Sequence, residues 1–127
     1  MKPEEIRILI CDDSIMVQKK MSDLLKSSGY TNIFAAKDGQ AAVDRYKEVN
    51  PHLVFMDIVM PVKSGVEALE EIMAFDSSAK VIMASSIGTQ SNLKEAIEKG
   101  AFDFLQKPIE DSKVLKLISG IEKRLNK

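Results

Sequence analysis

The chain has 127 residues, of which 45% are hydrophobic and 29% charged, and this composition is typical of one folded domain rather than of a disordered segment. Its 18 basic and 19 acidic side chains nearly cancel, which argues against a nucleic-acid or polyanion surface. The single cysteine cannot form an internal disulfide, and the apolar runs are too short to span a bilayer. We therefore expect one cytoplasmic domain over residues 1–127 that binds neither nucleic acid nor membrane.

Strands and helices are expected to alternate along the chain, because each short apolar run is followed by a segment of helical periodicity. The predicted strands cover residues 7–11, 31–36, 53–57, 80–85 and 101–106. The predicted helices begin near residues 14, 39, 65, 91 and 111. In the fourth helix we expect Leu93, Ala96 and Ile97 to face inward, and we expect Asp111 to cap the fifth. Five alternations with short connections predict an α/β fold, a parallel sheet with helices on both faces.

Acidic residues follow two of the predicted strands. Asp57 ends the third, a run of apolar residues of the kind that is buried on both faces in a parallel sheet, and Asp12 and Asp13 end the first. Ser85 and Lys107 come at the ends of the fourth and fifth strands. Ligands bind at this edge of open α/β sheets, so these side chains are expected to meet there. Three carboxylates beside one ammonium need a cation, and Mg²⁺ prefers such oxygen ligands.

Four short motifs carry a family resemblance. They are, in chain order, Ile10–Ser14, Met56–Pro61, Ala84–Ser86 and Gln106–Pro108. With these motifs the whole chain resembles response-regulator receiver domains, and it is most similar to the single-domain chemotaxis (CheY-like) type, with no segment left for an output domain. The resemblance implies a flavodoxin-like, doubly wound sheet of five parallel strands in the order 2-1-3-4-5 with five helices, and a monomer.

The resemblance also implies a phosphorylation site. Asp57 would accept a phosphoryl group from a sensor histidine kinase, as part of a two-component phosphorelay, and would hold it as an acyl phosphate. Asp13, Asp57 and the main-chain carbonyl of Val59 would bind Mg²⁺ or Mn²⁺, with Asp12 reaching the ion through water. The protein would not be an enzyme in the usual sense, because it would catalyse only phosphoryl transfer to its own Asp57 and slow hydrolysis from it.

The switch is expected to involve three further side chains. Lys107 and Ser85 would contact the phosphoryl oxygens, and Phe104 stands at the place of the switch aromatic, on the face formed by the fourth helix, fifth strand and fifth helix that would bind a downstream protein. Val59 and Ile87 are expected to border the approach of water to the acyl phosphate. Both are apolar and cannot orient water, which predicts a long-lived phosphoryl group or a separate phosphatase.

Two other kinds of function remain open. Phosphatases with an aspartate nucleophile tend to have a second acid two residues later, where this chain has Val59. A flavin-binding module on the same fold needs a hydroxyl- and glycine-rich phosphate loop after the first strand, where Asp12 and Asp13 would repel phosphate.

Overall fold

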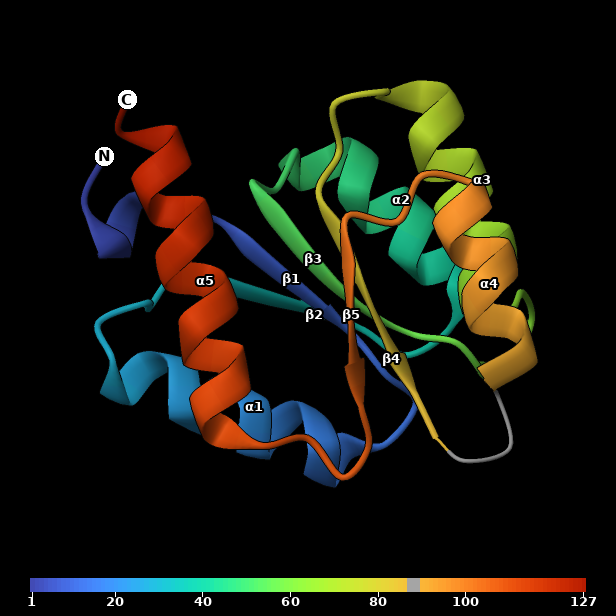
Figure 1. The fold of residues 1–127 in the computed structure, drawn as a ribbon, viewed down its shortest axis with the longest axis horizontal. Helices are drawn as coiled ribbons and strands as arrows, with labels where there is room; N and C mark the ends of the chain where they lie inside the picture. Colours follow the sequence, from blue (N-terminus) through green and yellow to red (C-terminus); the bar gives the residue numbers. More distant parts are fainter. Residues whose placement is uncertain (87–89) are drawn as a thin grey trace.

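The computed structural model describes residues 1–86 and 90–127, and its centre is a sheet of five parallel strands (Figure 1). The strands are β1 (Ile8–Cys11), β2 (Ile33–Ala36), β3 (Leu53–Asp57), β4 (Val81–Ser85) and β5 (Asp103–Gln106). Their order in the sheet is β2-β1-β3-β4-β5, and all four neighbouring pairs are parallel. This arrangement confirms the predicted flavodoxin-like α/β fold.

Within residues 1–86 and 90–127, five α-helices cover the two faces of the sheet. They are α1 (Ile15–Ser27), α2 (Gly39–Val49), α3 (Gly65–Phe75), α4 (Gln90–Glu98) and α5 (Asp111–Leu125), preceded by a short 3-10 helix over Pro3–Glu5. α1 and α5 lie on one face, and α2, α3 and α4 lie on the other (Figure 1). No helix in the described parts of the chain is long and apolar enough to cross a membrane.

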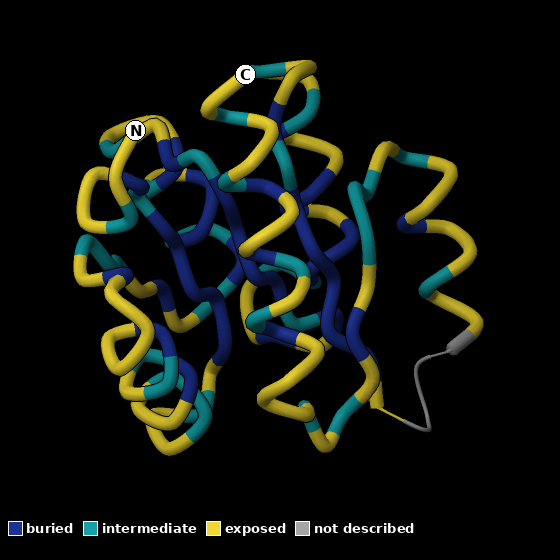
Figure 2. Tube along the Cα trace, turned by 60° about the vertical axis from the view of Figure 1, so that its left-hand side comes forward, coloured by how far each residue is buried: buried dark blue, intermediate teal, exposed yellow. Residues whose placement is uncertain are grey.

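Alternating side chains of the strands build a separate core on each face. Ile8 and Ile10 of β1 pack with α1 and α5, whereas Leu9 and Cys11 pack on the side of α2 and α3. Because both faces are covered, the strands are apolar at successive positions rather than at every second one. The central strands are correspondingly the most deeply buried part of the chain (Figure 2).

Side-chain caps set where the helices begin. The Ser14 hydroxyl accepts a hydrogen bond from the main-chain N–H of Val17, and Asp38 caps α2 in the same way. The prediction for α5 was wrong in detail. Glu110 occupies the N-cap position without a side-chain hydrogen bond, and Asp111 is the first helical residue. Its carboxylate still lies in the first turn, where the helix dipole favours negative charge.

Helix α4 lies at the edge of the molecule and is exposed over most of its surface (Figure 2). Ala96 is buried and Leu93 is half-buried, as expected, but Ile97 is 52% exposed and does not face inward. The expectation failed because only a narrow stripe of α4 meets the rest of the fold, and Ile97 is turned about 100° away from Ala96. An ion pair also joins the residue that follows α4 to α3, since Lys99 Nζ lies 2.7 Å from a Glu70 carboxylate oxygen.

Candidate functional site

The parallel register brings three carboxylates together at the C-terminal edge of the sheet. Cys11, the last residue of β1, pairs with Met56, so Asp12 follows β1 beside Asp57 at the end of β3. Asp12, Asp13 and Asp57 each offer a carboxylate oxygen, and these oxygens lie within 4.8 Å of one another. The three acidic residues that were predicted to lie close together therefore do so in the structure.

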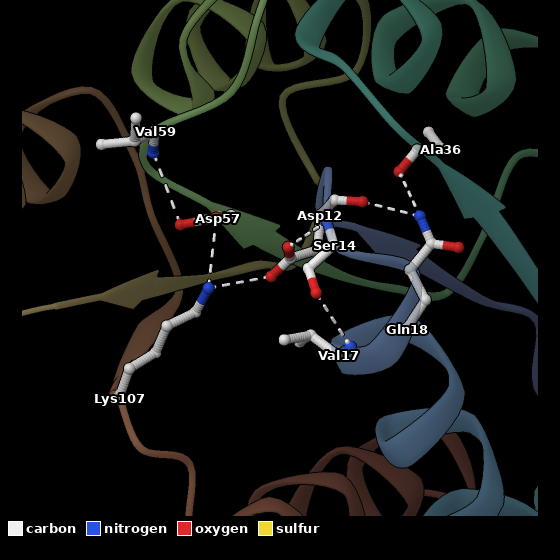
Figure 3. A network of polar contacts seen from close by, with 8 residues as sticks. All are labelled: Asp12, Ser14, Val17, Gln18, Ala36, Asp57, Val59 and Lys107. Carbon is white, nitrogen blue, oxygen red and sulfur yellow. Dashed lines mark hydrogen bonds and ion pairs between the residues drawn. The ribbon is translucent and has the colours of Figure 1, made fainter.

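The Lys107 ammonium group joins two of these carboxylates. Its Nζ lies 2.9 Å from Asp12 Oδ2 and 3.1 Å from Asp57 Oδ2, and Figure 3 shows the three side chains directed toward one another. The main-chain N–H of Lys107 donates to the carbonyl of Ser85 at 2.7 Å, which holds the lysine beside the end of β4. The Lys107–Pro108 peptide bond is cis. One cation thus partly neutralises the two less accessible acids of the cluster.

The three aspartates differ in how far their oxygens are occupied. Asp12 is only 4% exposed, and its second oxygen accepts the main-chain N–H of Ser14 at 2.9 Å. Asp57 Oδ1 accepts a longer bond of 3.4 Å from the N–H of Val59 (Figure 3). Asp13 is exposed and has no hydrogen bond or ion pair with any other described residue. Asp13 and Asp57 therefore retain the lone pairs that a ligand could use.

Burial and charge act against each other on the ionisation of this cluster. Burial raises the pKa of the Asp57 carboxyl group, and the neighbouring Lys107 ammonium opposes that rise. For Lys107, burial alone would lower the pKa, but the hydrogen bond to Asp12 and the charges of Asp57 and Asp12 outweigh burial and raise it. The lysine is consequently charged at neutral pH.

The donor set suits a hard divalent cation. All donors of the three clustered acids are carboxylate oxygens, with neither imidazole nor thiolate among them. Mg²⁺ and Mn²⁺ prefer such oxygens and keep several water ligands, which the exposed position of Asp13 allows. The residues present thus fit a metal of this class.

Two of the other expected site residues, Ser85 and Val59, lie next to this cluster. Ser85 is buried at the end of β4, where its neighbour Ala84 pairs with Asp57. Val59 is 60% exposed beside the cluster, and Phe104 is 46% exposed on β5. Ile87, expected to border the path of water, lies outside the described residues.

Gln18 also contributes to the site, but it was not predicted from the sequence. Its side-chain amide on α1 donates to the carbonyl oxygens of Asp12 and Ala36, at the ends of β1 and β2 (Figure 3). The available signal was a polar residue one turn after the helix cap Ser14, but that pattern is equally typical of a solvated helix face.

Comparisons with known proteins agree with this geometry. The family model of the response regulator receiver domain matches residues 8–119. Protein CcdB of Bacillus subtilis is 44% identical over 91% of this chain and 96% of its own length. Chemotaxis protein CheY of Thermotoga maritima is 39% identical over 92% of this chain and 98% of its own.

A solved structure is similar in fold as well as in sequence. One chain of the CheX-CheY-BeF3-Mg+2 complex from Borrelia burgdorferi aligns with a TM-score of 0.84 and 36% identity, covering 95% of this chain and 98% of that one. The shared fold, the acidic cluster with its lysine and these sequence matches lead to one conclusion. The chain belongs to the response regulator receiver domain family and is a relative of the chemotaxis protein CheY.

Proposed function

We propose that Asp57 accepts a phosphoryl group from a phosphohistidine of a sensor histidine kinase. The Asp57 oxygen attacks phosphorus, the phosphorus–nitrogen bond breaks, and its electron pair stays on the imidazole nitrogen, which takes up a proton. The product is an acyl phosphate on Asp57. The observation that carries this proposal is the Lys107 ammonium group, which lies 3.1 Å from Asp57 and is thus within reach of the oxygens of a newly attached phosphoryl group.

The remaining side chains of the site have matching roles in this proposal. Lys107 stabilises negative charge on the phosphoryl oxygens, and the hydroxyl of Ser85 donates to another of them. Catalysis stays confined to the protein's own Asp57, which is what a signalling domain needs. In contrast to aspartate phosphatases, the position two residues after the nucleophile is Val59, which can neither donate nor accept a proton.

The metal of the proposal is Mg²⁺, with Mn²⁺ as a substitute. Asp13, Asp57 and the Val59 carbonyl would hold the ion, and Asp12 would reach it through water. When bound, the ion neutralises charge on the transferring group. The related Borrelia structure combines CheY with BeF3 and Mg+2, which supports this choice.

The output of the switch is proposed to be a protein contact on the face of α4, β5 and α5. A groove on this face is lined by Phe102, Phe104, Leu117, Lys116 and Arg124. The Arg124 guanidinium lies 5.0 Å from the centroid of the Phe102 ring, so charge and apolar surface are combined there. A downstream protein that binds this groove, in chemotaxis as for the CheY relatives, would sense Phe104 as it changes position.

We further propose that residues 1–127 act as one cytoplasmic receiver that stays monomeric. A separate phosphatase would end the signal if hydrolysis is slow. Sedimentation before and after phosphorylation tests the monomer, and amide shifts around Phe104 on phosphorylation test the output face. Shifts confined to the acidic cluster would contradict the proposed switch.

The decisive experiment is intact mass after incubation with a small acyl phosphate and Mg²⁺. The parent protein should gain one phosphoryl group, and Asp57→Asn should gain none because it keeps the side-chain size but loses the nucleophile. Asp44→Asn is the matched control, since Asp44 is an exposed carboxylate on α2. A gain of one phosphoryl group by Asp57→Asn would refute Asp57 as the phosphorylation site. Steady turnover of a phosphomonoester would favour a phosphatase.

A further inference from the structure

The amide of Gln18 ties together the ends of two strands beside the acidic cluster. Its Nε2 lies 2.6 Å from the carbonyl oxygen of Asp12 and 3.2 Å from that of Ala36. The Ala36 carbonyl also accepts the main-chain N–H of Asp12 at 3.1 Å. A primary amide has two hydrogens, so one side chain can serve both carbonyls where the β1–β2 ladder ends.

This pair of hydrogen bonds fixes the peptide group between Asp12 and Asp13. The Asp12 carbonyl belongs to that planar group, so its direction also sets the direction of the Asp13 N–H and the position of the Asp13 Cα. The Asp13 side chain has no bond to another described residue that could orient it. Its place within 4.8 Å of the other carboxylates therefore depends on its main chain.

Other contacts already hold the start of α1. The Ser14 hydroxyl caps the helix by accepting the Val17 N–H, and the Ser14 N–H donates to the Asp12 carboxylate. The helix thus begins at residue 15 without help from the Gln18 side chain. Loss of the Gln18 amide is expected to affect the direction of the Asp12–Asp13 peptide more than the existence of the helix.

We propose that Gln18 is a positioning residue that orients the Asp12–Asp13 peptide and thereby holds the Asp13 carboxylate ready for a divalent cation. This inference rests on the proposed function, because it assumes that Asp13 binds the metal. Partners that orient metal ligands from behind commonly change metal affinity by about 10- to 100-fold when they are removed.

The test compares three variants. Gln18→Met keeps the length of the side chain and removes both donors, whereas Gln18→Arg restores N–H donors in a planar group. Gln40→Met is the matched control, because the Gln40 amide donates only to Asp44 on its own helix, at 2.9 Å. Each protein is measured for Mg²⁺ affinity by NMR titration, for the amide shifts of Asp13 and Ser14 without metal, and for its urea midpoint.

We expect Gln18→Met to bind Mg²⁺ about tenfold more weakly, with shifted Asp13 and Ser14 amides already in the metal-free protein. Gln18→Arg should recover most of the affinity, and Gln40→Met should match the parent. If Gln18→Met does not fold, Gln18→Ala, which lets water reach both carbonyls, takes its place.

Parental Mg²⁺ affinity and parental metal-free amide shifts in folded Gln18→Met would overturn the role of Gln18 while leaving the proposed function intact. A lower urea midpoint with unchanged Mg²⁺ affinity would also overturn it, because that result describes a purely structural contact. If the parent protein itself neither binds Mg²⁺ nor becomes phosphorylated, the proposed function fails, and this role of Gln18 fails with it.

Discussion

Gly65 lies where the main chain of Asp57, the proposed nucleophile, leaves no room for a side chain. A Cβ at this position would lie 1.9 Å from the carbonyl oxygen of Asp57 and 2.8 Å from its carbonyl carbon. The Gly65 N–H also donates to the Ile58 carbonyl at 2.7 Å, which fastens the start of α3 to the end of β3. Gly65→Ala therefore has to move either α3 or the main chain of Asp57.

The size of this effect follows from the distances. Real Cβ atoms almost never approach closer than 3.0 Å, so the two segments must separate by at least about 1.1 Å. Forcing extra atoms into a packed site costs about 1–3 kcal/mol, and here the Gly65 hydrogen bond weakens as well. A displacement of about 1 Å at a reacting group can slow a reaction by roughly 100-fold. We expect a loss of about 2–4 kcal/mol in unfolding free energy and phosphorylation slowed by about 10- to 100-fold.

Gly120→Ala is a matched control, for which the expected change in unfolding free energy has the opposite sign. Gly120 lies exposed in the middle of α5, and in the described part of the chain no heavy atom beyond its chain neighbours and the nearby backbone of its own helix lies within 4 Å of a Cβ built there. Gly120→Ala should stabilise the protein by about 0.5–1 kcal/mol, because alanine loses less backbone freedom in a helix, and should leave phosphorylation unchanged. Urea unfolding followed by circular dichroism, together with phosphoryl mass against time, measures both variants. Equal stability and equal phosphorylation rates in Gly65→Ala and the parent would refute this reasoning.

Three further changes test other parts of the chain. Burial and the charges of Arg7 and Lys80 lower the pKa of His52, so the unfolded chain binds a proton more readily than the folded one. The contribution of His52 to the unfolding free energy should therefore be fully present above about pH 6.5 and fall as the pH drops below that value. In urea titrations, His52→Gln should lessen this fall. Val62 is 78% exposed with φ 70°, so Val62→Asn should raise the unfolding free energy by about 1 kcal/mol, and an unchanged urea midpoint would argue against backbone strain there. Val59→Asn should shorten the phosphoryl lifetime by roughly tenfold by orienting water, which decay of phosphoryl mass would reveal and an unchanged rate would contradict.

The elements were predictable because their signals are local. The strands β1 to β4 are short, mainly apolar runs. Ser14, Asp38 and the glycines that follow α1 and α4 mark helix ends through their own side chains or backbone freedom. The acidic cluster was predictable for a related reason. Parallel strands end at one edge, so residues that follow β1 and β3 must lie close together once the fold class is known.

The details that failed depend on contacts distant in sequence. Ile97 fits the apolar period of α4 as well as Ala96 does, and only the position of α3 and the sheet decides which of them is covered. The contact of Gln18 was equally hard to predict, because its amide donates to two carbonyl oxygens whose directions are set by β1 and β2. Composition and periodicity carry no information about such directions.

The sparse attachment of α4 has a consequence for the order in which the fold opens. Of the described α4 side chains only Ala96 is fully buried, whereas α5 buries Val114, Ile118 and Ile121. A buried methyl group contributes about 0.8 kcal/mol and each larger side chain about 1.5–3 kcal/mol, so local opening of α4 should need several kcal/mol less than opening of α5. Amide exchange should therefore be faster over α4 than over α5. A single charge-assisted hydrogen bond, worth about 1.5–3 kcal/mol, is large enough to change the position of α4 while α5 stays in place.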